Sequence, residues 1–222
     1  MDKHEIRMKV WRSMEESNIA MFPRPVYNRI PSFKGADNAA SKLRNTSIYR
    51  RASVVKVNPD SPQRYVRYYA LTDGKLVIMP TPRLKGGFLV LDPGKIPGKL
   101  YSRASTIRGA FQLGVELPAN ELVVRTRRID LIVEGSVAVD VYGGRLGKGE
   151  GYGDKEYEML SKQGLVTSCT PIATTVHDIQ VSMEKLPQES HDVKIGLIAT
   201  PTKHFVTEYG EMQELKCSFN YL

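Results

Sequence analysis

The chain has 222 residues, of which 41% are hydrophobic and 25% charged, a composition typical of a globular domain with a sizeable buried core. No apolar run approaches the ~20 residues that a membrane-spanning helix needs, and the charged start MDKHEIRMKVW lacks the apolar centre of a secretory signal. With 32 basic and 24 acidic residues, the formal charge is +8. This balance favours an anionic partner such as a nucleotide, another polyanionic small molecule or a nucleic acid, with a merely solvated basic surface as the alternative.

Cysteine usage points to a reducing environment. Cys169 and Cys217 are too few for a disulfide framework, and their spacing fits no metal site. We therefore expect a cytoplasmic protein whose thiols stay reduced.

A helix is the first element expected along the chain. Asp2 can cap it and Glu5 lies three residues further on, as in a capping box. Trp11 is expected to anchor this helix in the core. Lys3 and Arg7 lie one turn apart, beside the apolar stripe formed by Ile6, Val10 and Met14.

The segment AMFPRPVYNRIPSFKGA that follows is rich in proline and has no periodicity, so it predicts a loop that wraps or links other elements. After it, residues 52–80 predict a β-α-β unit. An apolar run at 52–57 is followed by a helix that begins at Ser61-Pro62 and ends at Gly74, and then by a strand over 75–80. Such a unit predicts parallel strand pairing with a right-handed crossover.

The second half continues the alternation of strands and helices. Two apolar runs, at 129–133 and 137–141, precede a helix over 155–163 that Asp154 can cap, and later strands are expected within 165–173 and 193–200. The pattern predicts a single α/β domain over residues 1–222, with three α/β/α layers around a mostly parallel sheet.

The stretch GGRLGKGEGYGD, residues 143–154, has six glycines in twelve residues and lies between an expected strand and an expected helix. Glycines let backbone N–H groups converge on an anion, and the N-terminus of the following helix adds about half a positive charge. Arg145 and Lys148 add full charges. The chemistry therefore favours a phosphate site at the carboxyl end of a strand.

Neither common phosphate-binding motif matches this stretch. Glycines at 147, 149, 151 and 153 give G-x-G-x-G-x-G, which is neither the dinucleotide fingerprint G-x-G-x-x-G nor a P-loop ending in GK[ST]. A glycine-rich hairpin or an exposed flexible loop is the alternative.

The same residues carry a resemblance to a known family. Arg145-Leu146-Gly147-x-Gly149-x-Gly151-Tyr152-x-Asp154 is similar to the loop of the 5-formyltetrahydrofolate cyclo-ligase (methenyltetrahydrofolate synthetase) family. Other blocks agree in order along nearly the whole chain, and the segments FPRPV, RIPSFKGA and MPTPRL are similar to a divergent methenyltetrahydrofolate synthetase domain-containing branch. These blocks are the opening Lys3-His4-Glu5-Ile6-Arg7, Asp130–Val133 and the final Gln180-Val181…Leu186-Pro187…His191-Asp192-Val193.

The resemblance implies a fold like that of the NagB, RpiA and CoA-transferase proteins and a site for ATP and Mg²⁺. Lys3 and Arg7 would hold the phosphates of ATP, Asp154 and Asp192 would bind Mg²⁺ through carboxylate oxygens, and Arg145, Lys148 and Tyr152 would take part in catalysis. The cradle itself would be formed by Arg145, Leu146, Gly147, Lys148, Gly149, Glu150, Gly151, Tyr152 and Gly153.

The chain departs from the family pattern at several of these positions. The second aromatic residue of the family's GYYD is Gly153 here, the usual Arg after the Asp is Lys155, and the expected Phe before Asp140 is Val139. The family's substrate-contacting Glu has no confident match within VNPDSPQRY. The nucleotide half of the site therefore matches better than the folate half.

The resemblance implies a monomeric enzyme that uses ATP and Mg²⁺ to convert 5-formyltetrahydrofolate, a reduced folate, to 5,10-methenyltetrahydrofolate. One alternative is a related ATP-binding protein that acts on a different substrate. The other is a non-catalytic relative that binds RNA or another ligand. The basic charge would suit RNA binding, but this alternative does not explain why two acidic residues lie beside an anion cradle.

Overall fold

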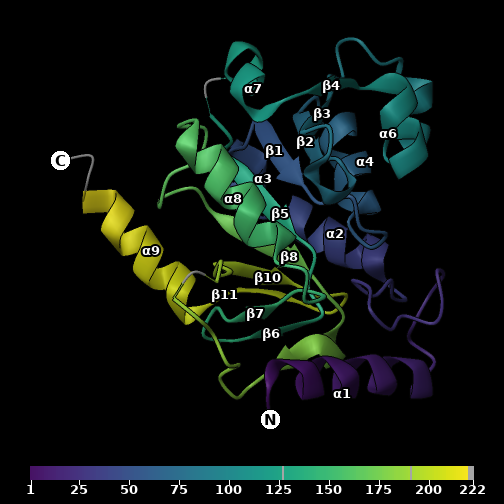
Figure 1. Cartoon of the computed structure of the whole chain (residues 1–222), viewed down its shortest axis with the longest axis vertical. Coiled ribbons are helices and arrows are strands. Elements are labelled where there is room, and N and C mark those ends of the chain that lie inside the picture. The colour runs from purple at the N-terminus through teal and green to yellow at the C-terminus, as the bar shows by residue number, and fades with distance from the viewer. Residues whose placement is uncertain (127, 191, 220–222) are drawn as a thin grey trace.

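The computed structural model describes residues 1–126, 128–190 and 192–219. Within these residues, one large sheet has eight strands in the order β11-β10-β8-β5-β1-β2-β3-β4. Pairing is parallel from β10 to β2, and the remaining strands pair antiparallel at the two edges (Figure 1). The parallel strands are β1 (Val54–Val57), β2 (Leu76–Pro80), β5 (Leu131–Glu134), β8 (Ile172–Thr175) and β10 (Leu197–Ala199), and the antiparallel ones are β3 (Phe88–Leu91), β4 (Val115–Leu117) and β11 (His204–Val206).

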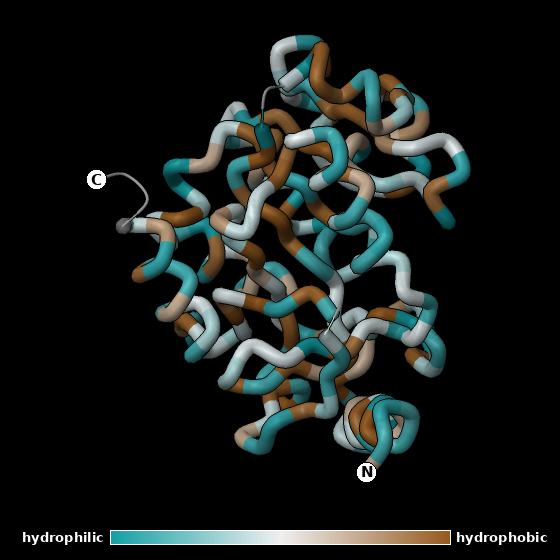
Figure 2. Tube along the Cα trace, turned by 60° about the vertical axis from the view of Figure 1, so that its left-hand side comes forward, coloured by the Kyte–Doolittle hydropathy of each residue, from teal (hydrophilic) through white to brown (hydrophobic). Residues whose placement is uncertain are grey.

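Helices cover both faces of this sheet, which confirms the predicted α/β class. One face packs against α2 (Ala36–Arg44), α3 (Ser47–Arg51), α4 (Arg64–Thr72), α5 (Tyr101–Ala104) and α6 (Ile107–Leu113). The other face packs against α7 (Ala119–Arg125) and α8 (Tyr152–Lys162). Figure 2 shows hydrophobic segments running through the middle of the molecule, as expected for a sheet buried between two layers.

The predicted β-α-β unit is present. Val54 to Lys56 of β1 pair in parallel register with Leu76 to Ile78 of β2, and α4 connects the two strands. The helix begins at Arg64 rather than at Ser61-Pro62, and Gly74 takes the left-handed φ of 73° expected after its end.

A second, three-stranded sheet corrects one prediction about the glycine stretch. β6 (Ala138–Asp140) pairs antiparallel with β7 (Arg145–Leu146) and parallel with β9 (Val181–Ser182). The strand before the glycine stretch therefore belongs to this small sheet and not to the parallel one. At its end the run turns back into β7 through Gly143 and Gly144, where Oδ1 of Asp140 accepts from the amides of Tyr142 and Gly144.

The two terminal helices lie outside the layers. α1 (Lys3–Glu16) has the predicted capping box of Asp2 and Glu5 and buries Trp11, as expected. α9 (Glu208–Phe219) lies on the opposite flank of the small sheet from α1 in Figure 1. None of the described helices is long and apolar enough to cross a membrane.

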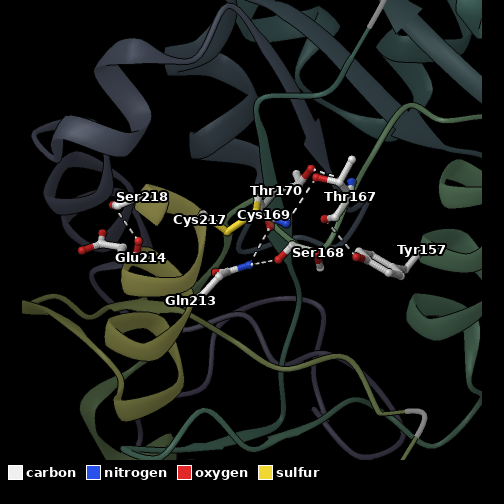
Figure 3. The surroundings of a disulfide bond; sticks show 9 residues. All are labelled: Tyr157, Thr167, Ser168, Cys169, Thr170, Gln213, Glu214, Cys217 and Ser218. Carbon is white, nitrogen blue, oxygen red and sulfur yellow. Dashed lines mark hydrogen bonds between the residues drawn. A yellow bond between two sulfur atoms is a disulfide. The ribbon is translucent and has the colours of Figure 1, made fainter. Parts of the chain in front are cut away.

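A disulfide corrects the expectation of reduced thiols. Cys169, in the turn before β8, is bonded to Cys217 of α9 (Figure 3). The bond joins two residues that are 48 positions apart in the sequence. Gln213, one helical turn earlier, donates from Nε2 to the carbonyls of Ser168 (2.6 Å) and Thr170 (3.3 Å). Two cysteines suffice for one bond when the fold brings them together, which their spacing in the sequence does not reveal.

Candidate functional site

A cavity of about 610 Å³ opens at the carboxyl ends of the parallel strands. Its walls come from α1, from the turns that follow β1 and β2, from the glycine stretch with the start of α8, and from Glu189, Asp192 and Val193. In the strand order, β1 has β2 on one side and β5 on the other. The chain therefore adds β2, β3 and β4 on one side of β1 and the later strands of this sheet on the other side. Such a switch point is where open α/β sheets bind ligands.

All residues predicted for the site line this one cavity, although they are far apart in sequence. They are Lys3, Arg7, Arg145, Leu146, Gly147, Lys148, Gly149, Glu150, Gly151, Tyr152, Gly153, Asp154 and Asp192. His191, which belongs to the last sequence block of the resemblance, lies outside the described residues.

The glycine stretch divides into a hairpin turn and a loop. Gly143 and Gly144 form the turn between β6 and β7, where Oδ1 of the buried Asp140 accepts hydrogen bonds from the amides of Tyr142 (2.9 Å) and Gly144 (2.7 Å). The hairpin alternative is therefore correct for this first part. Residues 147–151 then leave the small sheet and enter α8.

The loop needs glycine at two positions because of its backbone. Gly149 and Gly151 have φ of 105° and 67°, in the region that L side chains rarely adopt. Gly151 is the N-cap of α8, so the helix begins at Tyr152 and Asp154 lies in its first turn. The prediction that Asp154 caps the helix is wrong because the left-handed glycine lets the helix begin earlier.

No described side chain caps the N-terminus of α8. Tyr152, Gly153 and Asp154 of its first turn face the cavity, so their unpaired N–H groups and the helix dipole are directed at whatever binds there. Helix N-termini that follow a glycine loop bind phosphate by this means.

Cations from two elements surround this helix start. Nε of Arg7 donates to the carbonyl of Gly147 (2.7 Å), and its guanidinium carbon lies 3.5 Å from the position of a Cβ at Gly149. α1 is thereby joined to the loop by the side chain that the resemblance assigns to phosphate. Lys148 lies at the exposed rim, where it pairs with Glu150 at 2.7 Å.

The carboxylates expected to bind Mg²⁺ lie on the same side of the cavity. Oδ1 of Asp154 accepts from the amide of Val193 (3.0 Å), which places it beside Asp192. Oδ2 of Asp192 is 2.7 Å from Nζ of Lys3, which also pairs with Glu189 at 2.9 Å. The described residues contain no cluster of three or more metal-ligating side chains. Two carboxylates beside a phosphate cradle nevertheless fit Mg²⁺, which keeps several waters and takes other ligands from phosphates.

Beneath the cradle lies a buried ion cluster that the sequence interpretation missed, formed by Lys56, Glu134 and Glu156. Nζ of Lys56 lies 2.6 Å from Oε1 of Glu134 and 2.5 Å from Oε2 of Glu156, and the three side chains are only 1%, 2% and 7% exposed. The contact with Glu156 is a close ion pair whose angle is not that of a hydrogen bond. Asn58 joins the cluster by accepting from Lys56 (2.5 Å) and donating to Glu134 (3.0 Å).

Burial and charge oppose each other in this cluster. Burial raises the pKa of Glu134, but the charges of Lys56 and Arg145 together hold it below its ordinary value. Burial raises the pKa of Glu156 to about 7 although the charge of Lys56 lowers it, since the like charge of Glu134 adds to the effect of burial. The one sequence signal was Lys56 within the apolar run VVKV, since a charge in a buried strand needs a partner.

Two further residues were also missed. Asp60, after β1, lines the cavity opposite the glycine loop, and burial raises the pKa of its carboxyl group. Arg83, after β2, lines the cavity from a turn in which it and Leu84 both have positive φ, 58° and 55°. Strained non-glycine residues of this kind are frequent at binding sites. Both residues follow strand ends, which is the signal that could have found them.

Comparison with known proteins identifies the family of the chain. The family model of the 5-formyltetrahydrofolate cyclo-ligase family matches residues 1–201. This chain belongs to that family. Among curated relatives, methenyltetrahydrofolate synthase domain-containing proteins from Danio rerio and Bos taurus are 43% and 39% identical over 211 and 210 residues, which is 93% of this chain.

The chain spans about half the length of these curated relatives, 54% in both cases. Solved structures of 5,10-methenyltetrahydrofolate synthetases from Aquifex aeolicus and Mycoplasma pneumoniae have TM-scores of 0.56 and 0.53 with 18% and 14% identity. They cover 93% and 90% of this chain and 93% and 99% of their own. At such identity they show that this member of the cyclo-ligase family has the same fold.

Proposed function

We propose that the chain couples ATP consumption to ring closure of a reduced folate, converting 5-formyltetrahydrofolate to 5,10-methenyltetrahydrofolate. The observation that carries the proposal is the uncapped N-terminus of α8, which opens with its glycine loop and the cations Lys3, Arg7 and Lys148 into one cavity. Membership of the family supports the same reaction.

The reaction needs positioning and charge neutralisation rather than a protein nucleophile. The formyl oxygen takes the γ-phosphoryl group of ATP and ADP leaves. N10 then attacks the activated carbon and gives up its proton to the departing phosphate as the C–O bond breaks. Lys3, Arg7 and Lys148 would neutralise the phosphates, with loop amides directed at the transferred group. Tyr152 would orient the substrate at the cavity wall, and Asp154 and Asp192 would hold Mg²⁺, which supplies further neutralisation.

The test has two readouts. ATP with Mg²⁺ should raise the melting temperature, because a ligand at 100 times its Kd stabilises the native state by about 2.7 kcal/mol. Formation of the methenyl product, followed by absorbance, should depend on both ATP and 5-formyltetrahydrofolate. Arg7→Met should weaken ATP binding about tenfold, whereas Arg12→Met on the exposed side of α1 should leave it unchanged. Absence of any shift at millimolar ATP would refute the nucleotide site.

A second candidate is an ATP-dependent enzyme of this family that acts on a different substrate. It is favoured by the polar floor of the cavity, where Gly153 replaces the second aromatic residue and Asn58, Asp60 and Glu156 are among the lining residues. ATP binding without methenyl formation would select this candidate.

A further inference from the structure

The glycine loop encloses an arginine. A Cβ added at Gly147 would lie 3.1 Å from Nη2 of Arg145, and one added at Gly153 would lie 3.2 and 3.3 Å from its Nη1 and Nη2. These distances are shorter than ordinary van der Waals contact. Gly147 and Gly153 therefore provide space for the guanidinium of Arg145, whereas Gly149 and Gly151 provide backbone conformations.

Hydrogen bonds direct the guanidinium of Arg145 into the protein. Nε and Nη2 both donate to the carbonyl of Gly135, at 3.1 and 2.7 Å, and the side chain is only 9% exposed. Nη2 also lies 3.4 Å from Oε2 of Glu134. The same Oε2 would lie 3.1 Å from a Cβ at Gly153, so Glu134 and Arg145 share the volume that a side chain at 153 would fill.

The buried cluster balances this charge. Lys56 carries one positive charge against the two carboxylates of Glu134 and Glu156, which leaves 1 − 2 = −1 when both are ionised. Arg145 brings the set to zero. Buried ions persist only when paired in this way, so Arg145 and Lys56 together let Glu134 remain charged beneath the loop.

On this geometry we infer that Arg145 is a positioning residue and does not itself contact the phosphates. The glycine loop packs around its guanidinium, and we call this role that of an internal template. The inference rests on the proposed function only for the identity of the ligand. Arg145 joins β7 to the end of β5, and Lys56 joins β1 and β5 to the second turn of α8. The loop and the helix start are thereby held against the sheet before any ligand arrives. The ligand is met by backbone amides, Lys3, Arg7 and Lys148.

The direction in which one substitution changes the Kd distinguishes a positioning role of Arg145 from direct contact with the ligand. Removing a carboxylate beside an anion site normally strengthens anion binding, and it would strengthen binding further if it released Arg145 to reach the phosphate. If Arg145 is the template, Glu134→Gln loosens the loop and instead weakens binding. We expect the Kd for inorganic tripolyphosphate to rise about tenfold in Glu134→Gln. Glu158→Gln, which removes the exposed partner of Lys162 on the outer part of α8, is the matched control and should leave the Kd unchanged.

Two further comparisons of variants exclude simple loss of stability. Arg145→Lys keeps the charge but loses the double donation to Gly135, so it should bind tripolyphosphate as weakly as Arg145→Met. Gly153→Ala should also weaken binding, since its Cβ would press on Arg145 and Glu134, whereas Gly98→Ala, whose Cβ would lie 3.8 Å from its nearest neighbour, should not. All affinities are measured well below each variant's melting temperature. Tighter binding by Glu134→Gln, or rescue by Arg145→Lys, would overturn the inference.

Hydrogen exchange of the unliganded chain keeps this test independent of the proposed function. Amides of residues 147–154 should exchange faster in Glu134→Gln and Arg145→Met than in the unmodified chain, with no such change in Glu158→Gln. If the unmodified chain fails to bind tripolyphosphate and ATP, the proposed function fails while faster exchange still supports the template. Unchanged exchange rates in both variants would contradict the template role of Arg145, even if ATP binds.

Discussion

The two terminal helices lie outside the three layers but are attached in different ways. α1 buries Trp11 and Met14 at 1% and 0% exposure, and its Lys3 and Arg7 reach across to residues 140 or more positions away. α9 leaves Met212 and Leu215 at 46% and 63% exposure and is tied to the body by the Cys169–Cys217 bond (Figure 1, Figure 3).

The difference separates a helix that completes a site from one that does not. The apolar face of α1 packs against the small sheet and against residues 20–39, which follow the helix in the chain. This packing holds the first turn of α1 at the rim of the cavity. α9 contributes no residue to that cavity. Loss of α1 should therefore abolish ligand binding, whereas loss of α9 should cost stability alone.

The largest expected effect comes from Trp11→Ala. Trp11 is buried and donates from Nε1 to the carbonyl of Arg29 (3.0 Å), so its truncation should lower the free energy of unfolding by about 3–5 kcal/mol. Chemical denaturation measures this, and the stabilisation by ATP should disappear with it. Arg12→Ala, at the exposed neighbouring position, should change stability by less than about 0.5 kcal/mol. Unaltered ATP stabilisation in Trp11→Ala would show that α1 does not complete the site.

Removal of the disulfide comes next. Cys169→Ser with Cys217→Ser should lower the free energy of unfolding by about 2–4 kcal/mol, since the bond closes a loop with a sequence separation of 48. The tripolyphosphate Kd should not change, because α9 lies away from the cavity. Hydrogen exchange should accelerate within 208–218 and not within 3–16. A changed Kd would contradict the contrast between the two helices.

Lys3 provides a smaller effect that depends on pH. Burial lowers the pKa of Lys3, but hydrogen bonds to Asp192 and Glu189 together raise it above its ordinary value. A raised lysine pKa contributes stability that is fully present at neutral pH and is lost as pH rises through the folded-state pKa. Lys3→Met should therefore be less stable than the unmodified chain by about 0.2–1 kcal/mol at pH 8, as measured by denaturation. The gap should close in the alkaline range above pH 10.5, and a gap that is constant with pH would assign the effect to packing.

The smallest effect is expected on α9. Leu215→Ala should change the free energy of unfolding by less than about 0.5 kcal/mol, because the side chain is 63% exposed. The matched change on α1, Met14→Ala, removes a side chain with 0% exposure and should cost about 2–5 kcal/mol. Equal costs at the two positions would mean that α9 is packed as firmly as α1.

Much of the fold could be predicted because its signals are local. The capping box at Asp2 and Glu5, the β-α-β unit of 52–80 and the left-handed Gly74 each depend on neighbours within a few residues. Where the same kind of reasoning failed, distant groups decided. Asp154 binds the amide of Val193 rather than capping α8, and the strand before the glycine stretch joins a separate sheet.

The sequence by itself determined which residue types gather at the cavity. The spacing of the glycines, the cations near them and the family pattern can all be recognised from the order of residues alone. Only the tertiary structure decided what each of them does. Lys56 meets Glu134 across 78 positions, and Arg145 fills the space left by Gly147 and Gly153 because of where β5 ends and α8 begins. The physical reason is that backbone preference acts between neighbours in sequence, whereas the burial and neutralisation of charge act between neighbours in space.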